Sequence, residues 1–264
     1  MNVSLAVTTV PNPSADEIRL AQELAAELQV QYVPRSATVS KMQKQMGVLQ
    51  MLVAGKRLTL HAHGREIFFH PSMAVVRVKR MLLGDTDLMV EKSGLQSGDV
   101  VLDCTLGMGS DAIVFAHAVG TRGKVIGLEQ NPVLAALVRI GMRNWPSDVL
   151  EVAEAMRRVE VVAAHHLDFM RTMPDQSVDI VYFDPMFRST VKESVNFDPI
   201  RELSITDAIS PNSVEEAKRI ARKSIVLKER AASGEFERLG FPPPLRRSSS
   251  FTYSVIFRRG EESF

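Results

Sequence analysis

The stretch Val100-Val101-Leu102-Asp103-Cys104-Thr105-Leu106-Gly107-Met108-Gly109-Ser110-Asp111 is the most informative part of the chain. Apolar, β-prone residues end in an acid, a Gly-x-Gly turn follows, and the apolar residues 112–119 then predict a helix. Glycine permits backbone conformations that other residues avoid and lets a ligand approach the main chain. This order of strand, glycine turn and helix predicts the first βα unit of a nucleotide-binding sheet.

The next strand supports a nucleotide site. Residues 124–129 are mostly apolar and end in Glu129, 20 positions after Gly109. An acid at that place can accept hydrogen bonds from the two hydroxyls of a ribose.

Two ligand classes use this layout. The pattern Gly107-x-Gly109-x-x-Ala112 satisfies the dinucleotide fingerprint, so an NAD(P) oxidoreductase stays an alternative. Asp103 favours another ligand, because a carboxylate repels a pyrophosphate, whereas the amino acid end of S-adenosylmethionine (SAM) carries an ammonium and a sulfonium. Val-Leu-Asp-x-x-x-Gly-x-Gly is similar to the first motif of class I methyltransferases. The sequence therefore predicts that SAM binds at Asp103, Gly107, Gly109, Asp111 and Glu129, although the acids could also be ordinary strand-end and helix N-terminal residues.

Composition narrows the class of protein. The 264 residues are 45% hydrophobic and 24% charged, which is ordinary for a globular protein. The net charge of +1 predicts that any nucleic-acid surface is a local patch. The single cysteine, Cys104, excludes an internal disulfide. We find neither a signal-peptide pattern nor an apolar run of the roughly 20 residues that span a bilayer, so we expect a cytoplasmic location.

Two units are expected along the chain. Residues 1–71 predict a small α/β unit, with Ser14 and Glu17 as a capping box and His63-Gly64 as a hairpin turn. Its histidines lack carboxylate or cysteine companions at ligand spacing, so no metal site is expected. Residues 72–264 form the second unit, which carries the only dense positive run near the glycine turn: Arg77, Lys79 and Arg80.

Further strands complete the predicted sheet. Residues 159–164 and 224–228 and the nearly continuous apolar run 178–183 predict parallel strands, and 250–257 predicts a late antiparallel strand. We expect an α/β fold of the class I Rossmann-like methyltransferase type, with a mostly parallel seven-stranded sheet and the N-terminal extension. In methyltransferase sheets an acid after the third strand commonly faces the adenine amine, and Asp168 stands at that place. A helix N-cap is the alternative role of Asp168.

The chemical centre is predicted at Asp184-Pro185-Met186-Phe187, directly after a strand. This stretch matches the Asn/Asp-Pro-Pro-Tyr/Phe motif of methyltransferases that act on the exocyclic amines of nucleobases. The lone pair of such an amine is delocalised into the ring, so its hydrogens need acceptors. Asp184 and the carbonyl of Pro185 supply two acceptors, and Phe187 can stack on the base. The alternative is a turn followed by a core phenylalanine.

The chain resembles the ribosomal small-subunit RNA methyltransferase J family. The resemblance rests on Asp103-Cys-Thr-Leu-Gly-Met-Gly-Ser-Asp-Ala, Leu128-Glu-Gln-Asn-Pro-Val-Leu-Ala-Ala-Leu and Tyr182-Phe-Asp-Pro-Met-Phe, and it runs from about residue 73 to 257. It implies SAM-dependent methylation of a guanosine amine in 16S rRNA, or in the 30S subunit. The cofactor-lining residues that it implies are Ser110, Asp111, Glu129, Gln130, His165, His166 and Asp184.

The chain departs from that family on the substrate side. Arg188 replaces the family's usual proline, and Ser189-Thr190-Val191-Lys192-Glu193 replaces a lysine-rich loop. RNA backbone contacts are expected from Arg77, Lys79, Arg80, Arg188 and Lys192. Methylation of another amine, in other RNA, DNA or protein, stays an alternative, as does an RNA-binding module with a decayed catalytic site.

Overall fold

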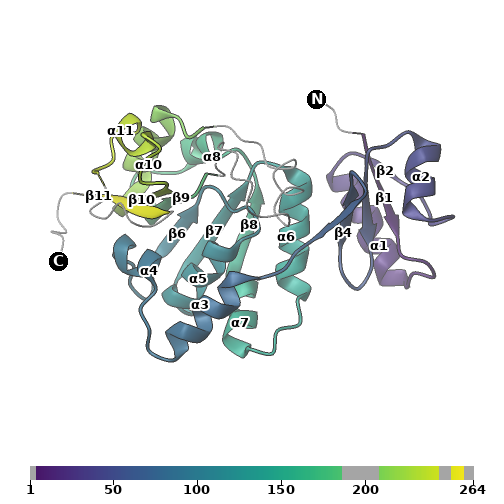
Figure 1. Ribbon diagram of the computed structural model, residues 1–264, viewed down its shortest axis with the longest axis horizontal. Coiled ribbons are helices and arrows are strands. Elements are labelled where there is room, and N and C mark those ends of the chain that lie inside the picture. Colours follow the sequence, from purple (N-terminus) through teal and green to yellow (C-terminus); the bar gives the residue numbers. More distant parts are fainter. Residues whose placement is uncertain (1–3, 186–207, 244–250, 259–264) are drawn as a thin grey trace.

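The computed structural model describes residues 4–185, 208–243 and 251–258, which form two sheets and the helices that cover them (Figure 1). The predicted residues Phe187, Arg188 and Lys192 lie outside the described ranges.

The N-terminal sheet has the strand order β2-β1-β3-β4-β5. Strand β1 is parallel to β2 and β3, whereas β3, β4 and β5 are antiparallel neighbours. The buried side chains of β1 and β3 alternate between two apolar clusters, so helix α1 covers one face and helix α2 the other. The elements of this unit are β1 (Leu5–Thr9), α1 (Ala15–Glu27), β2 (Gln31–Tyr32), α2 (Val39–Met46), β3 (Gln50–Ala54), β4 (Thr59–Ala62) and β5 (Arg65–Phe68).

Two short motifs predicted in this unit, the capping box and the hairpin turn, are present in the structure. Ser14 caps α1, and its backbone N–H donates to the Glu17 carboxylate at 2.8 Å, which completes the predicted capping box. His63 and Gly64 both have positive φ, 49° and 73°, as a tight hairpin turn between β4 and β5 requires.

The second sheet has the order β11-β10-β9-β6-β7-β8, and all neighbouring strands are parallel except β10 and β11. This confirms the mostly parallel α/β fold, with its late antiparallel strand. The described residues form six strands in this sheet, so the seventh predicted strand is not found there. The strands are β6 (Val100–Asp103), β7 (Lys124–Glu129), β8 (Val159–Ala163), β9 (Val178–Phe183), β10 (Ala221–Glu229) and β11 (Thr252–Phe257).

Helices cover both faces of this sheet (Figure 1). The apolar runs of α5 and α6 pack on one face, and α8, α10 and α11 pack on the other. The segment 72–98, which leads to the first strand of this sheet, forms two helices. The helices of this unit are α3 (Met73–Leu82), α4 (Leu88–Ser93), α5 (Ser110–Val119), α6 (Pro132–Asn144), α7 (Leu150–Arg158), α8 (His166–Thr172), α10 (Pro211–Ile220) and α11 (Glu235–Arg238).

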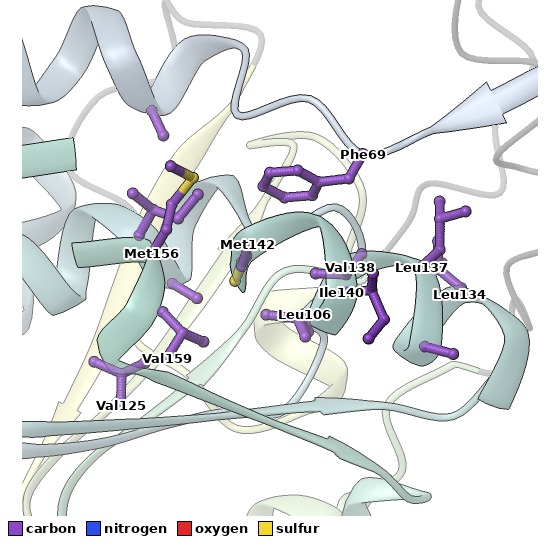
Figure 2. Close-up of a cluster of buried hydrophobic side chains, with 14 of the residues drawn as sticks. Phe69, Leu106, Val125, Leu134, Leu137, Val138, Ile140, Met142, Met156 and Val159 are labelled. Carbon is purple, nitrogen blue, oxygen red and sulfur yellow. The ribbon is translucent and has the colours of Figure 1, made fainter. Parts of the chain in front are cut away.

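Phe69, just after β5, joins the two units (Figure 2). Its ring lies over α6, on the opposite side of that helix from Leu106 of the glycine turn. Gly141 makes this approach possible, because a Cβ there would lie 2.2 Å from Phe69 Cβ. The Arg139–Glu27 ion pair, at 2.6 Å, adds a polar contact between α6 and α1. In the ranges that the structure describes, no helix has the length and apolarity needed to cross a membrane.

Candidate functional site

Polar side chains gather at one edge of the second sheet, where four parallel strands end. Asp103 ends β6, Glu129 ends β7, Asp184 follows β9, and Lys228 lies near the end of β10. The carboxyl ends of parallel strands form the usual ligand-binding edge of an α/β sheet. Three of these four residues were predicted as site residues from the sequence.

The glycine turn after β6 is hydrogen-bonded to the residues that end or follow two neighbouring strands. Gly107 and Gly109 have φ values of 51° and 76°, which favour glycine, and Gly109 is the N-cap of α5. The Gly107 N–H donates to Glu129 Oε2 at 3.1 Å, and the Thr105 hydroxyl accepts from the Asp184 N–H at 2.6 Å. The turn therefore fixes the ends of β7 and β9 relative to each other.

The Glu129 carboxylate is buried against the glycine turn. Only 8% of the residue is exposed, and its second oxygen accepts the Asn131 N–H at 2.9 Å. Burial raises the pKa of Glu129, although these backbone donors partly oppose the rise. Beside it in the chain, Gln130 is half-buried, as is Ser110 at the start of α5.

Asp111 has a role that the sequence did not predict. Its Oδ2 accepts from the Tyr182 hydroxyl at 2.6 Å and from Lys228 Nζ at 3.1 Å, and its Oδ1 accepts from Arg77. Three donors thus occupy both carboxylate oxygens, so the side chain is not the open acceptor that was predicted for a ligand cation. Burial acts to raise the pKa of Asp111, but Lys228 and Arg77 hold it well below its ordinary value.

Arg77 also differs from its prediction. Its guanidinium pairs with both oxygens of Asp87 at 2.7 and 2.8 Å, in addition to Asp111. A guanidinium held by two carboxylates is not the solvated cation expected to contact an RNA backbone. Lys79 and Arg80, on the same helix, are exposed, and Arg80 pairs with Asp85 at 2.9 Å.

Lys228 and Asp184 form the centre of the edge. The ammonium lies 2.7 Å from Asp184 Oδ2, and both side chains are mostly enclosed. Burial raises the pKa of Asp184, with Asp111 adding to the rise and Lys228 opposing it. Burial also raises the pKa of Asp103, to about 8.

The histidines after β8 lie beside the sheet rather than among the acids. His166 is buried, contacts the Ser213 hydroxyl at 3.1 Å and meets the Phe183 ring edge-on. His165 stacks on it, with ring centroids 4.5 Å apart. Asp168 is 74% exposed and pairs with Arg171 and His165, as an acid in the first turn of a surface helix would.

Lys228, Tyr182 and Thr105 are site residues that were not predicted. Lys228 stands directly after the apolar residues 225–227, so it had the same sequence signal as Asp103 and Asp184, which is a charge near the end of a parallel strand. Thr105 and Tyr182 looked like ordinary turn and strand residues.

The arrangement fits SAM better than a dinucleotide. Four acidic side chains, Asp103, Asp111, Glu129 and Asp184, and two cations surround the edge, and one cation, Arg77, is also neutralised by Asp87. An acid excess suits a ligand with an ammonium and a sulfonium, and it repels a pyrophosphate.

Comparisons with known proteins agree with this fit. Residues 36–237 match the family described as "Putative SAM-dependent methyltransferase". "Uncharacterized protein YpiP" of Bacillus subtilis (strain 168) is 40% identical over 252 residues, which cover 95% of this chain and 98% of that protein. "Ribosomal RNA small subunit methyltransferase J" of Actinobacillus succinogenes is 33% identical over 132 residues, or 48% of this chain and 49% of that relative. That match spans about half the length of either protein.

A solved structure shows the same fold over nearly the whole chain. The SAM-dependent methyltransferase NGO1261 from Neisseria gonorrhoeae matches with a TM-score of 0.65 at 18% identity, over 97% of each chain. Since the family match also covers most of the sequence, the chain belongs to the SAM-dependent methyltransferase family and its cofactor is S-adenosylmethionine.

Proposed function

We propose that this methyltransferase modifies the exocyclic amine of a guanosine in small-subunit ribosomal RNA, in the cytoplasm. The observation that carries the amine substrate is Asp184-Pro185 at the end of β9, directly beside the acid-lined glycine turn. The RNA class is supported by relatives named "Ribosomal RNA small subunit methyltransferase J", such as the 33% identical Actinobacillus succinogenes protein.

The cofactor is proposed to lie across the glycine turn. Glu129 would accept the ribose hydroxyls, and the backbone of Gly107 and Gly109 would lie against the ligand. Asp103, buried at the end of β6, would face the cationic methionyl end. The family resemblance adds Ser110, Asp111, Gln130, His165 and His166 around this core. The usual acid after the third strand of methyltransferase sheets adds Asp168, toward the adenine.

Residues of this chain would prepare the amine for transfer. When bound, SAM supplies a methyl group on a sulfonium, whose sulfur keeps the bonding electron pair as the methyl leaves. The Asp184 carboxylate and the Pro185 carbonyl would accept hydrogen bonds from the two N–H groups of the amine and so orient its lone pair. Holding reactants in line contributes up to roughly 7–11 kcal/mol in well-oriented systems.

The substrate surface is proposed around α3 and the segment after β9. Lys79 and Arg80 are its described basic residues, and they are exposed. From the sequence alone, we assign Phe187, Arg188 and Lys192 to the same substrate surface. A base must leave its stack to reach a strand-end pocket, at a cost of a few kcal/mol, so backbone contacts must help to hold it.

The test is methyl transfer from isotopically labelled SAM to 30S subunits and to free 16S rRNA, both from cells lacking this protein. We expect a methylguanosine with the methyl group on N2 in the RNA digest by mass spectrometry, and none with the Asp184→Ala variant. Labelled DNA, protein or another RNA, with no label in 16S rRNA, would overturn the RNA assignment. Unimpaired transfer by Asp184→Ala would overturn the role of Asp184.

A further inference from the structure

Lys228 is placed beside Asp184 by the register of two strands. Leu227 of β10 pairs with Phe183 of β9, so the next residues, Lys228 and Asp184, lie side by side on the face that packs against α5. Their ammonium and carboxylate are 2.7 Å apart, and 22% and 25% of the two side chains are exposed. An ion pair that is this enclosed is weakly screened by salt.

A chain of contacts holds the ammonium in place. Asp111, at the first turn of α5, accepts from Lys228 at 3.1 Å and from the Tyr182 hydroxyl at 2.6 Å. Arg77 binds the other oxygen of Asp111 and is itself clamped by Asp87, the N-cap of α4. Lys228 therefore contacts two carboxylates, one of which is fixed by two further donors.

The acids near Asp184 disfavour its charge. These acids are Asp111 and Asp103, whereas Tyr182 on β9 and Tyr253 on β11 have raised pKa values, stay neutral at pH 7 and supply no cation. Burial raises the pKa of Asp184, and Lys228 is the cation that opposes this within hydrogen-bond distance. Burial acts to lower the pKa of Lys228, but Asp111 and Asp184 raise it overall, so the ammonium stays charged at neutral pH.

We infer that Lys228 is a positioning residue, which keeps Asp184 ionised and oriented as the acceptor for the substrate amine. This inference rests on the proposed function. In the step, the amine lone pair forms the new N–C bond, the bonding pair of the methyl group stays on sulfur, and the amine loses one proton. An ionised Asp184 can take that proton and pass it to solvent, whereas a protonated one cannot.

Three variants test the inference. Lys228→Met removes the charge at similar length, and Lys228→Arg keeps it. Lys223→Met is the matched control, because Lys223 is on the same strand, pairs with Asp99 at 2.8 Å and has an 18% exposed side chain far from the acid cluster along β10. Thermal unfolding identifies variants that fail to fold.

The first measurement needs no substrate. Carboxyl carbon NMR of protein labelled with ¹³C-aspartate follows the titration of Asp184, whose resonance is assigned with Asp184→Asn. We expect Lys228→Met to move this titration upward by about 1–3 pH units, because a cation at hydrogen-bond distance is lost. Lys228→Arg and Lys223→Met should leave it near its wild-type place. An unchanged titration in Lys228→Met would overturn the inference whatever the substrate is.

The second measurement is the pH profile of methyl transfer to 30S subunits. We expect Lys228→Met to shift the acid limb of kcat to higher pH, so that turnover measured on that limb falls about tenfold for each pH unit of the shift. Affinity for S-adenosylhomocysteine, measured by calorimetry, should change less than threefold. A loss of that affinity with an unchanged profile would overturn the positioning role. If wild-type protein methylates no 16S rRNA, the proposed function fails, while the NMR titration still decides the role of Lys228.

Discussion

At the residue scale, the buried acid Asp103 links ligand binding to a proton. Its pKa is about 8, so it is largely protonated at pH 7 in the free protein. A bound ammonium or sulfonium lowers the pKa of a nearby carboxyl group. We therefore expect SAM binding at pH 7 to release close to one proton, measured by calorimetry in buffers with different heats of ionisation. Asp103→Asn should bind with no such release, and equal heats in all buffers for wild-type protein would contradict the prediction.

The same carboxyl group makes stability depend on pH. Unfolded, Asp103 titrates near its ordinary pKa of 3.8, and folded it titrates near 8. Between these values the unfolded chain has lost a proton that the folded chain keeps, so the free energy of unfolding falls as the pH rises. The slope contributed by this one group is at most about 1.4 kcal/mol per pH unit.

Urea unfolding at pH 5 and pH 8 measures this dependence. Relative to Asp103→Asn, which keeps an acceptor for the Thr105 N–H but does not titrate, the wild-type protein should lose stability between the two pH values. Parallel behaviour of the two proteins would show that Asp103 titrates normally.

At the element scale, the contact of Phe69 with α6 connects the N-terminal unit to the catalytic unit. A Cβ at Gly141 would lie within 2.2 to 2.7 Å of three Phe69 side-chain atoms, and the ring also meets Trp145 edge-on. Gly141→Ala should therefore destabilise the protein by about 1–3 kcal/mol. At a helix position without such a contact, the same change would stabilise by up to about 1 kcal/mol, so the sign is diagnostic.

A double-mutant cycle checks that the contact is the cause. Phe69→Ala alone should cost about 3–5 kcal/mol, as large aromatic deletions in a core do. In the double variant the ring that clashes is gone, so its cost should be clearly less than the sum of the two single costs in denaturant unfolding. If the two single costs simply add, the destabilisation by Gly141→Ala does not come from its contact with Phe69.

At the scale of the whole molecule, the near-neutral charge restricts where RNA can bind. The net charge is +1, so phosphate contacts must come from local patches rather than from a general field. Arg80, with a 70% exposed side chain, is a candidate, whereas Arg77 is held by two acids. Arg80→Glu should weaken 30S binding and reduce the slope of log affinity against log salt by about 1.

Arg19→Glu is the control for this experiment. Arg19 is equally exposed and also forms a local ion pair, with Asp16, but it lies on α1 of the N-terminal unit. Equal salt slopes for wild type and Arg80→Glu would show that Arg80 on α3 does not contact the RNA.

Arg77→Met should instead lower the thermal stability, because the buried carboxylates of Asp87 and Asp111 each lose the Arg77 donor.

Much of the fold was predictable because its signals are local. The capping box at Ser14 and the hairpin turn at Gly64 depend on neighbours only a few residues away, and both are confirmed. The mostly apolar strands and the glycine turn identified the sheet type, since parallel strands covered on both faces are nearly continuous apolar runs. The same patterns placed Asp103, Glu129 and Asp184 at strand ends, and they predicted SAM as the cofactor.

The tertiary structure alone decided how the charges at that edge are paired. Lys228 meets residues 44 and 117 positions away, Asp184 and Asp111, because β10 lies beside β9 and α5 packs over both. Arg77 reaches Asp111 from 34 positions away, and this contact makes it a structural partner rather than a surface cation. Strand patterns indicate which residues stand at an edge, but the pairing depends on strand order and helix packing, which bring distant side chains within hydrogen-bond distance.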